Sequence, residues 1–206
     1  RATLRIGCAQ WMYDRWIGKL LIGFSERFPD VSLHVEIEHS EDMIPMLQHK
    51  LLDLAFIAYE MNSGGISSRL FKQTDILFVG APEVFGGLKQ GIMKQGLTQI
   101  PLIYSDIWDS YLEDISKHTL SGGMVFCVHS NMLASAKQFC LAGAGCCFLP
   151  AAMLEQELKE GTLIEIPIYD LPVRSMTTYM AYQRGNLNTE VLKDWMKFYE
   201  ENSQDL

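Results

Sequence analysis

Five cysteines and five histidines are the residues of this chain best suited to metal binding or redox chemistry. The cysteines are Cys8, Cys127, Cys140, Cys146 and Cys147. Their spacing lacks the CxxC pairs or Cys/His clusters of zinc sites, and a disulfide between the adjacent Cys146 and Cys147 would be strained. We therefore expect no metal site, and a reducing, cytoplasmic setting in which most thiols pack in the core. Redox sensing is the alternative.

Sequence motifs for catalysis are absent. The chain has no GxSxG elbow, no GxGxxG or phosphate-binding loop, and no His/Glu metal pair. The glycines of Gly143-Ala144-Gly145 precede an expected strand rather than follow one, which is typical of a tight turn. The sequence therefore predicts a binding protein that is not an enzyme and needs no cofactor.

Composition narrows the class of protein further. The chain has 206 residues, 48% of them hydrophobic, and a formal net charge of −8. This apolar content excludes a disordered chain, and no apolar run reaches the roughly 18 residues of a membrane span. Because nucleic-acid binding needs clustered Lys and Arg, the acidic balance argues that this chain does not itself hold DNA.

The first sixty residues predict an open α/β sheet. Apolar spacing of three and four residues predicts a helix over 14–28, and alternation predicts a half-buried strand over 31–38. Ser40 or Asp42 is expected to cap the next helix, with Pro45 in its first turn. Strands Leu4–Cys8 and Leu52–Ile57 complete the order, and the second of these reads as a strand buried on both faces.

A second α/β segment follows, and the chain then returns to the first pattern. The expected strands are Ile76–Val79, Leu102–Tyr104, Met124–Val128, Cys146–Leu149, Leu163–Ile166 and Met176–Gln183. The expected helices are Trp108–Lys117, one from a Ser130 or Asn131 cap to Leu141, Met153–Glu160 with an end at Gly161, and Thr189–Glu201.

Ligands of open α/β sheets bind beyond the carboxyl ends of the strands. The candidate binding residues at these ends are Cys8, Ala9, Gln10, Trp11, Met12, Ser40, Tyr59, Ser105, His129, Ser130 and Phe148. Several have structural alternatives: Trp11 and Met12 as packing residues, Ser40 as a helix cap, Tyr59 as a surface residue of a turn, and His129 as a histidine satisfied within the fold.

Several blocks resemble one family in their order and spacing. These are "LRIGCAQ", "FSERFPDVSLHVEIEHSEDMIPMLQHKLLDLAFIA", "SRLFKQTDILFVGAP" and "CLAGAGCCFLPAAMLEQELKEGTLIEI". Together they are similar to the effector-binding domain of LysR-type transcriptional regulators, and the resemblance covers essentially the whole chain.

The resemblance implies two Rossmann-like α/β subdomains joined by two crossover strands, as in type II periplasmic binding proteins, with a small effector in the cleft between them. The first subdomain would be 1–80 plus 179–206 and the second 81–178, with crossovers near 77–82 and 176–180. It also implies an N-terminal winged helix-turn-helix domain, absent from this chain, which would make all DNA contacts. Homodimers or homotetramers would pair through 17–28 and 31–37.

Two departures from the family pattern bear on structure and ligand. A glycine usually precedes the "LDLA" strand, where the helix ends in a left-handed turn; Lys50 or its neighbour takes that place here. The loop after the first strand is poor in hydroxyl groups, which disfavours a simple small carboxylate as the effector. Two other functions stay open: a solute-binding protein of a transport system, and a redox-switched regulator that uses its cysteines.

Overall fold

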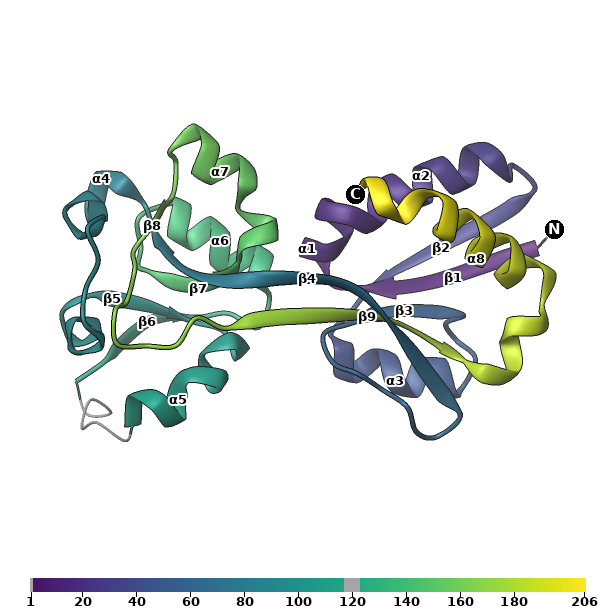
Figure 1. Ribbon diagram of the computed structural model, residues 1–206, viewed down its shortest axis with the longest axis horizontal. Helices are drawn as coiled ribbons and strands as arrows, with labels where there is room; N and C mark the ends of the chain where they lie inside the picture. The colour runs from purple at the N-terminus through teal and green to yellow at the C-terminus, as the bar shows by residue number, and fades with distance from the viewer. Residues whose placement is uncertain (1, 117–122) are drawn as a thin grey trace. The chain divides into compact units, whose positions relative to one another are not determined.

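The computed structural model describes residues 2–116 and 123–206, and the chain folds into two compact units. Unit 1 comprises Arg1–Gln73 and Thr177–Leu206, and unit 2 comprises Thr74–Met176. Strands β4 (Ile66–Gly80) and β9 (Ser175–Gln183) each run from one unit into the other (Figure 1). Within the described residues, no helix is long and apolar enough to span a membrane.

Unit 1 is a sheet with helices on both faces. Its remaining elements are β1 (Ala2–Cys8), α1 (Gln10–Met12), the π-helix η1 (Tyr13–Ile17), α2 (Gly18–Arg27), β2 (Val31–Ile37), α3 (Ser40–Gln48), β3 (Leu54–Ile57) and α8 (Glu190–Asn202). Strand β1 pairs in parallel with β2 and β3, and β9 pairs antiparallel with β3. Helices α2 and α8 lie on one face and α3 on the other (Figure 1). Every residue of β3 is buried, as expected for a strand covered on both sides.

The helix after β1 begins earlier than the sequence predicted, at Gln10 rather than Asp14. The apolar spacing did not indicate this start because the helix contains a π turn, in which the Gly18 N–H donates to the carbonyl of Tyr13, five residues before it. The buried pair Trp11 and Met12 therefore recurs five residues later at positions 16 and 17, a spacing outside the α-helical period. Gly18 suits this turn, because a Cβ there would lie 3.1 Å from the Tyr13 oxygen.

Strand β2 has the predicted position but not the predicted burial. Every residue of β2 is at least partly exposed, including Val35 at 38% and Ile37 at 36%. The strand pairs with β1, and each strand beyond β1 follows on the opposite side, so β2 forms the edge of the sheet. The prediction of a half-buried strand is therefore wrong, because an edge strand leaves part of its apolar face uncovered.

Helix α3 differs from its prediction in the role of Ser40 and in the position of Pro45. Ser40 is the first helical residue rather than a cap, and Pro45 lies in the second turn rather than the first. At the far end, Lys50 has a φ of +60°, so the left-handed turn expected there is confirmed without a glycine.

Unit 2 is built around two sets of strands and a large aromatic core. Its elements are α4 (Pro82–Phe85), β5 (Pro101–Tyr104), α5 (Asp109–Ser116), β6 (Val125–His129), α6 (Leu133–Leu141), β7 (Cys147–Pro150), α7 (Glu155–Glu160) and β8 (Ile164–Glu165). Strands β5 and β6 are parallel, whereas β7 and β8 pair antiparallel with β4. Phe148 of β7 stacks on Tyr111 of α5 at a centroid distance of 4.1 Å, and Trp108 is fully buried beside it.

The sequence located most elements of unit 2 to within two residues. The 3₁₀ turn Asp106–Trp108 precedes α5, and Lys117, the expected end of that helix, lies outside the described residues. Ser130 does not cap α6, because the N-cap of this helix is Met132. The Ser130 hydroxyl instead accepts a hydrogen bond from the Met132 N–H and donates one to the Met132 carbonyl. Gly161 ends α7 in the left-handed conformation, as predicted.

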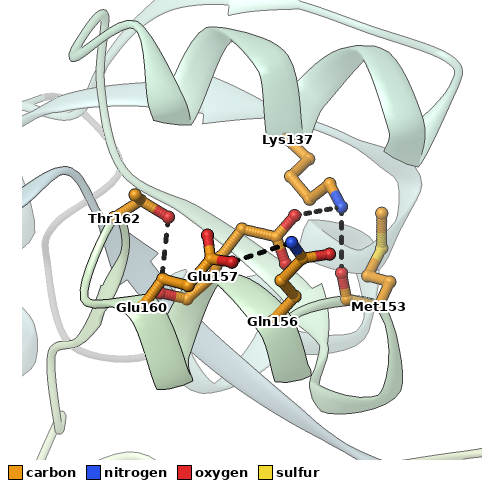
Figure 2. Close-up of polar contacts among 6 residues, drawn as sticks. All are labelled: Lys137, Met153, Gln156, Glu157, Glu160 and Thr162. Carbon is orange, nitrogen blue, oxygen red and sulfur yellow. Dashed lines mark hydrogen bonds and ion pairs between the residues drawn. The ribbon is translucent and has the colours of Figure 1, made fainter.

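Helices α6 and α7 are joined by a partly buried ion pair. The Lys137 ammonium lies 2.6 Å from a carboxylate oxygen of Glu157 and also donates to the Met153 carbonyl at 3.1 Å (Figure 2). The two charged side chains are only 24% and 16% exposed. The pair therefore ties the helix before β7 to the helix after it.

Candidate functional site

The parallel strands of unit 1 bring three chain segments to one edge of its sheet. Strands β1, β2 and β3 are parallel neighbours, so their carboxyl ends, at Cys8, Ile37 and Ile57, lie together. The segments that follow contain the predicted residues Ala9, Gln10, Ser40 and Tyr59. This edge is where an α/β sheet offers helix N-termini and loops to a ligand.

Polar contacts occur both between these segments and within one of them. The Ser40 hydroxyl accepts a hydrogen bond from the Ala58 N–H at 3.0 Å, which joins the start of α3 to the end of β3. The Gln10 amide donates to the Asp14 carboxylate at 2.8 Å. Tyr59 is 38% exposed, and burial together with the charge of Glu41 raises the pKa of its phenol. Polar side chains at this edge thus have defined positions while remaining partly accessible.

The side chains of three other predicted residues of unit 1 lie in the core. Cys8 is fully buried, Trp11 is 5% exposed and Met12 is 1% exposed. The Trp11 ring packs edge-on against Trp16 with centroids 5.5 Å apart. This burial favours the packing alternative for Trp11 and Met12.

Unit 2 has a corresponding edge at the carboxyl ends of β5 and β6. Tyr104 ends β5 and His129 ends β6, and their rings lie 5.2 Å apart. The Ser130 N–H donates to the Tyr104 carbonyl at 3.0 Å, and the Tyr104 hydroxyl donates to the Asp109 carboxylate. This hydrogen bond to Asp109, more than burial, raises the pKa of Tyr104 to about 12. The structure thus brings Tyr104, His129 and Ser130 together and adds Asp109.

Ser105 and Phe148 are buried parts of the same region. Ser105 follows Tyr104 directly and is 1% exposed, and its hydroxyl has no hydrogen-bond partner among the described residues. A buried hydroxyl without a partner is costly, so this group is a candidate to bind water or ligand. The Phe148 ring belongs to the aromatic core and is 4% exposed.

Burial makes most of the thiols unreactive. It raises the pKa of Cys8 and of Cys146 to about 12 and is the main cause in both, and a hydrogen bond with Cys147 raises the pKa of Cys140 as well. A thiol must ionise to attack an oxidant or bind a metal, so these groups resist both. Only Cys127 is exposed among the five. The described residues contain no group of three or more His, Cys, Asp or Glu side chains placed to hold a metal ion.

The chain matches the family model "LysR substrate binding domain" over residues 1–204. The chain belongs to this family. Among curated relatives, a transcriptional regulator of Bacillus subtilis, YusT, is 25% identical over 197 residues, which is 94% of this chain and 63% of YusT. The chain therefore spans less than two thirds of the length of that relative.

Solved structures agree on the fold. The regulatory domain of CrgA from Neisseria meningitidis superposes with a TM-score of 0.78 at 17% identity, covering 98% of both chains. The effector domain of AmpR from Pseudomonas aeruginosa gives 0.74 at 17% identity, covering 100% of this chain and 96% of the other. The chain thus has the type II periplasmic-binding-protein-like α/β fold of LysR regulatory domains, as the sequence resemblance predicted.

Two carboxylates escaped the sequence-based list of site residues. Asp14 and Asp109 contact or adjoin predicted residues, yet neither follows its strand immediately. The signal that could have identified them is their place in the helical segments that follow β1 and β5.

Proposed function

We propose that this chain is the ligand-sensing domain of a bacterial LysR-type regulator, and that a small effector binds at the carboxyl ends of its parallel strands. The observation that carries this proposal is the family match over residues 1–204. The accessible polar side chains at the strand ends supply suitable binding groups in each unit. The domain would bind its effector without catalysis and act in the cytoplasm.

The binding groups are the polar candidates of the two edges. In unit 1 they are Gln10, Ser40 and Tyr59, and in unit 2 they are His129, Ser130 and the buried Ser105. Amide, hydroxyl and imidazole groups fix the orientation of a small ligand through hydrogen bonds. The buried candidates Cys8, Trp11, Met12 and Phe148 would support these groups by packing, and Ala9 would act through its backbone.

We propose further that the domain forms homodimers through unit 1, in a regulator that is dimeric or tetrameric. The apolar side chains Val35 and Ile37 on the edge strand β2 and Ile22 on α2 are exposed, Ile22 at 61%. Exposed apolar side chains on an unpaired edge strand favour association with another chain. This supports the pairing surface that the sequence resemblance implied.

In the whole regulator, DNA binding would belong to an N-terminal winged helix-turn-helix domain. Effector binding would shift the population of domain conformations and so change the geometry of the oligomer on its operator. Such a shift requires only that the effector bind one conformation more tightly than the other.

A ligand screen with variants tests the effector site. The purified chain is screened by thermal denaturation against a library of metabolites, because a compound that binds only the folded state must raise Tm. For each hit, Gln10→Ala and Ser130→Ala should each lower the ligand-induced rise in Tm relative to the rise in the unsubstituted chain. Glu83→Gln, an exposed substitution in α4, serves as control. Hits that are insensitive to both alanine variants would refute the site.

A further inference from the structure

Strand β2 leaves one edge of the unit 1 sheet unpaired. It stands last in the strand order, and in the described part of the chain it pairs only with β1. The Glu38 N–H donates to the Cys8 carbonyl at 3.2 Å, so the backbone groups of the even-numbered residues point toward β1. Those of the odd-numbered residues Leu33, Val35 and Ile37 therefore point to the free edge, where another strand can pair with them.

The side chains of β2 divide by chemistry between the two faces of the sheet. Successive side chains alternate, so Leu33, Val35 and Ile37 share one face. His34 and Glu36 share the other. Val35 is 38% exposed and Ile37 36%, and both His34 and Glu36 are exposed as well. The free edge thus carries an apolar row on one face and a histidine near a carboxylate on the other.

We propose that two copies of this domain join edge to edge through β2, antiparallel and centred on Val35, to form one continuous sheet. The inference rests on the homodimer of the proposed function and adds its geometry, namely the strand that pairs and the register of the pairing. A two-fold axis at Val35 places this residue opposite Val35 of the second copy. The same axis places His34 opposite Glu36 of that copy. It also places Leu33 opposite Ile37.

The backbone and the side chains favour the same register. Because Leu33, Val35 and Ile37 direct their N–H and C=O groups to the free edge, they form the hydrogen-bonded pairs of the antiparallel ladder. His34 and Glu36 then form a non-hydrogen-bonded pair, in which the Cα atoms are only about 4.5 Å apart and the side chains meet closely. Two-fold symmetry repeats this His–Glu pair, so each dimer contains it twice.

Neighbouring registers place like groups opposite each other. Moving the axis from Val35 to the preceding residue puts His34 opposite itself, and moving it to the following residue puts Glu36 opposite itself. An axis two residues later puts Glu36 opposite Glu38, and one two residues earlier puts Glu36 opposite Asp30. Like charges directly opposite one another are destabilising. Among these five registers, only the one centred on Val35 pairs opposite charges without pairing like ones.

Charged side chains on an edge strand also have an ordinary protective role. They hinder pairing with other chains, most effectively when the charges that would face each other have the same sign. In β2 the residue two positions before Glu36 is His34, and an imidazole donates a hydrogen bond to a carboxylate whether it is charged or neutral. The exposed Val35 between them adds an apolar contact on the opposite face. This sequence suits self-pairing better than protection.

Cysteine substitutions test the register. They are made in a Cys127→Ser background, which removes the one exposed thiol among the five. Val35→Cys should form a disulfide between copies on oxidation with diamide, because Cα atoms of a hydrogen-bonded pair lie about 5.5 Å apart and disulfides span about 4.4–6.8 Å. Leu33→Cys and Ile37→Cys should each fail alone, since identical residues would lie about 14 Å apart along the strand. A mixture of these two variants should cross-link.

Exchange of the polar pair tests the other face. His34→Glu sets a carboxylate opposite Glu36 twice per dimer and should raise the Kd of the homodimer about tenfold. The swapped variant, His34→Glu with Glu36→His, restores the pair and should return the Kd to within about threefold of the original. His49→Glu makes the same replacement at an exposed position that ends α3, and should leave the Kd unchanged. Sedimentation velocity measures all four chains.

The outcomes separate this geometry from the dimer itself. A chain that dimerises but cross-links through Ile37→Cys alone, or fails to cross-link through Val35→Cys, would overturn the β2 pairing and leave a homodimer of another geometry. Equal Kd values for His34→Glu and the swapped variant would overturn the register. A chain that stays monomeric at high concentration would refute both the pairing and the proposed homodimer, while the ligand screen would still decide the effector site.

Discussion

At the scale of single residues, burial decides which reactive groups of this chain can react. Cys8, Cys140, Cys146 and Cys147 are buried, and only Cys127 among the five thiols is exposed. For Cys8 and Cys146 the pKa rises from 9.0 to about 12, chiefly because burial disfavours the thiolate. The redox-switched alternative therefore has little chemical support at these positions.

The rate of alkylation should differ between the exposed thiol of Cys127 and the buried thiols. A thiol of pKa 12 is ionised in only about one molecule in ten thousand at pH 8, so iodoacetamide should modify Cys127 long before Cys8 or Cys146. Mass spectrometry of the native chain over time measures the order, and the chain in urea provides the control with all five thiols accessible. Rapid modification of Cys146 in the native state would contradict the burial described here.

The same pKa shifts predict alkaline instability. Because the folded-state pKa values of Cys8 and Cys146 lie above the unfolded value, their contribution to stability is complete below pH 9 and is lost as the pH rises from about 9 to about 12. The free energy of unfolding in urea should therefore fall over this range. The Cys8→Ala variant should show a shallower fall, and an identical slope in this variant would be evidence against the assignment.

At the scale of elements, close packing and partly buried polar contacts fix how helices and strands meet. The glycine turn before β7 illustrates packing: a Cβ on Gly145 would lie 2.6 Å from the carbonyl oxygen of Pro101 in β5. The contact between α6 and α7 illustrates polarity, since Lys137 satisfies both Glu157 and the Met153 carbonyl (Figure 2).

Gly145→Ala should destabilise the chain substantially. The added methyl group meets backbone atoms that cannot move aside cheaply, so we expect a loss of about 2 kcal/mol or more in urea unfolding. Gly87→Ala is the matched control, because nothing lies within 4 Å of a Cβ at that position. Equal effects of the two substitutions would disprove the close approach of the turn to β5.

Lys137→Ala should cost about 1–3 kcal/mol, because it leaves the Glu157 carboxylate only 16% exposed and without its ammonium partner. Lys193→Ala removes an exposed pair with Glu190 and should cost less than about 0.5 kcal/mol. Urea unfolding of each variant measures this loss in the free energy of unfolding. A loss for Lys137→Ala no larger than that of the control would show that the pair does not hold α6 to α7.

At the scale of the whole molecule, unit 1 presents an apolar edge suited to a second copy. Ile22→Asp combined with Val35→Asp should raise the Kd of a homodimer at least about a hundredfold, since a carboxylate buried in an apolar interface loses its hydration. Sedimentation velocity measures the association state. Val173→Asp, at a side chain 83% exposed in unit 2, should leave it unchanged. A wild-type chain that stays monomeric at high concentration would refute the pairing.

Sequence reasoning recovered the order of elements because apolar periodicity and turn residues are local signals. It located the buried strand β3 and the left-handed residues Lys50 and Gly161. It missed the early start of the helix at Gln10, since one π turn shifts the apolar spacing. It also overestimated the burial of β2, because alternation reports an apolar face but not whether anything covers that face.

The candidate site was predictable in position but not in detail. The strand-end rule indicated His129 and Ser130 from the sequence, yet the contacts of Tyr104 with Asp109 and of Ser40 with Ala58 depend on tertiary structure. The burial of Phe148 likewise depends on a neighbour distant in the chain, Tyr111.

The most direct test of the account is an amide chemical-shift map of the chain, isotope-labelled, during titration with a compound that raises its Tm. The account predicts that the largest shifts fall on the segments that follow β1, β3, β5 and β6, including Gln10, Tyr59 and Ser130. Shifts confined to α7 and β8, or to the exposed edge strand β2, would contradict a strand-end effector site.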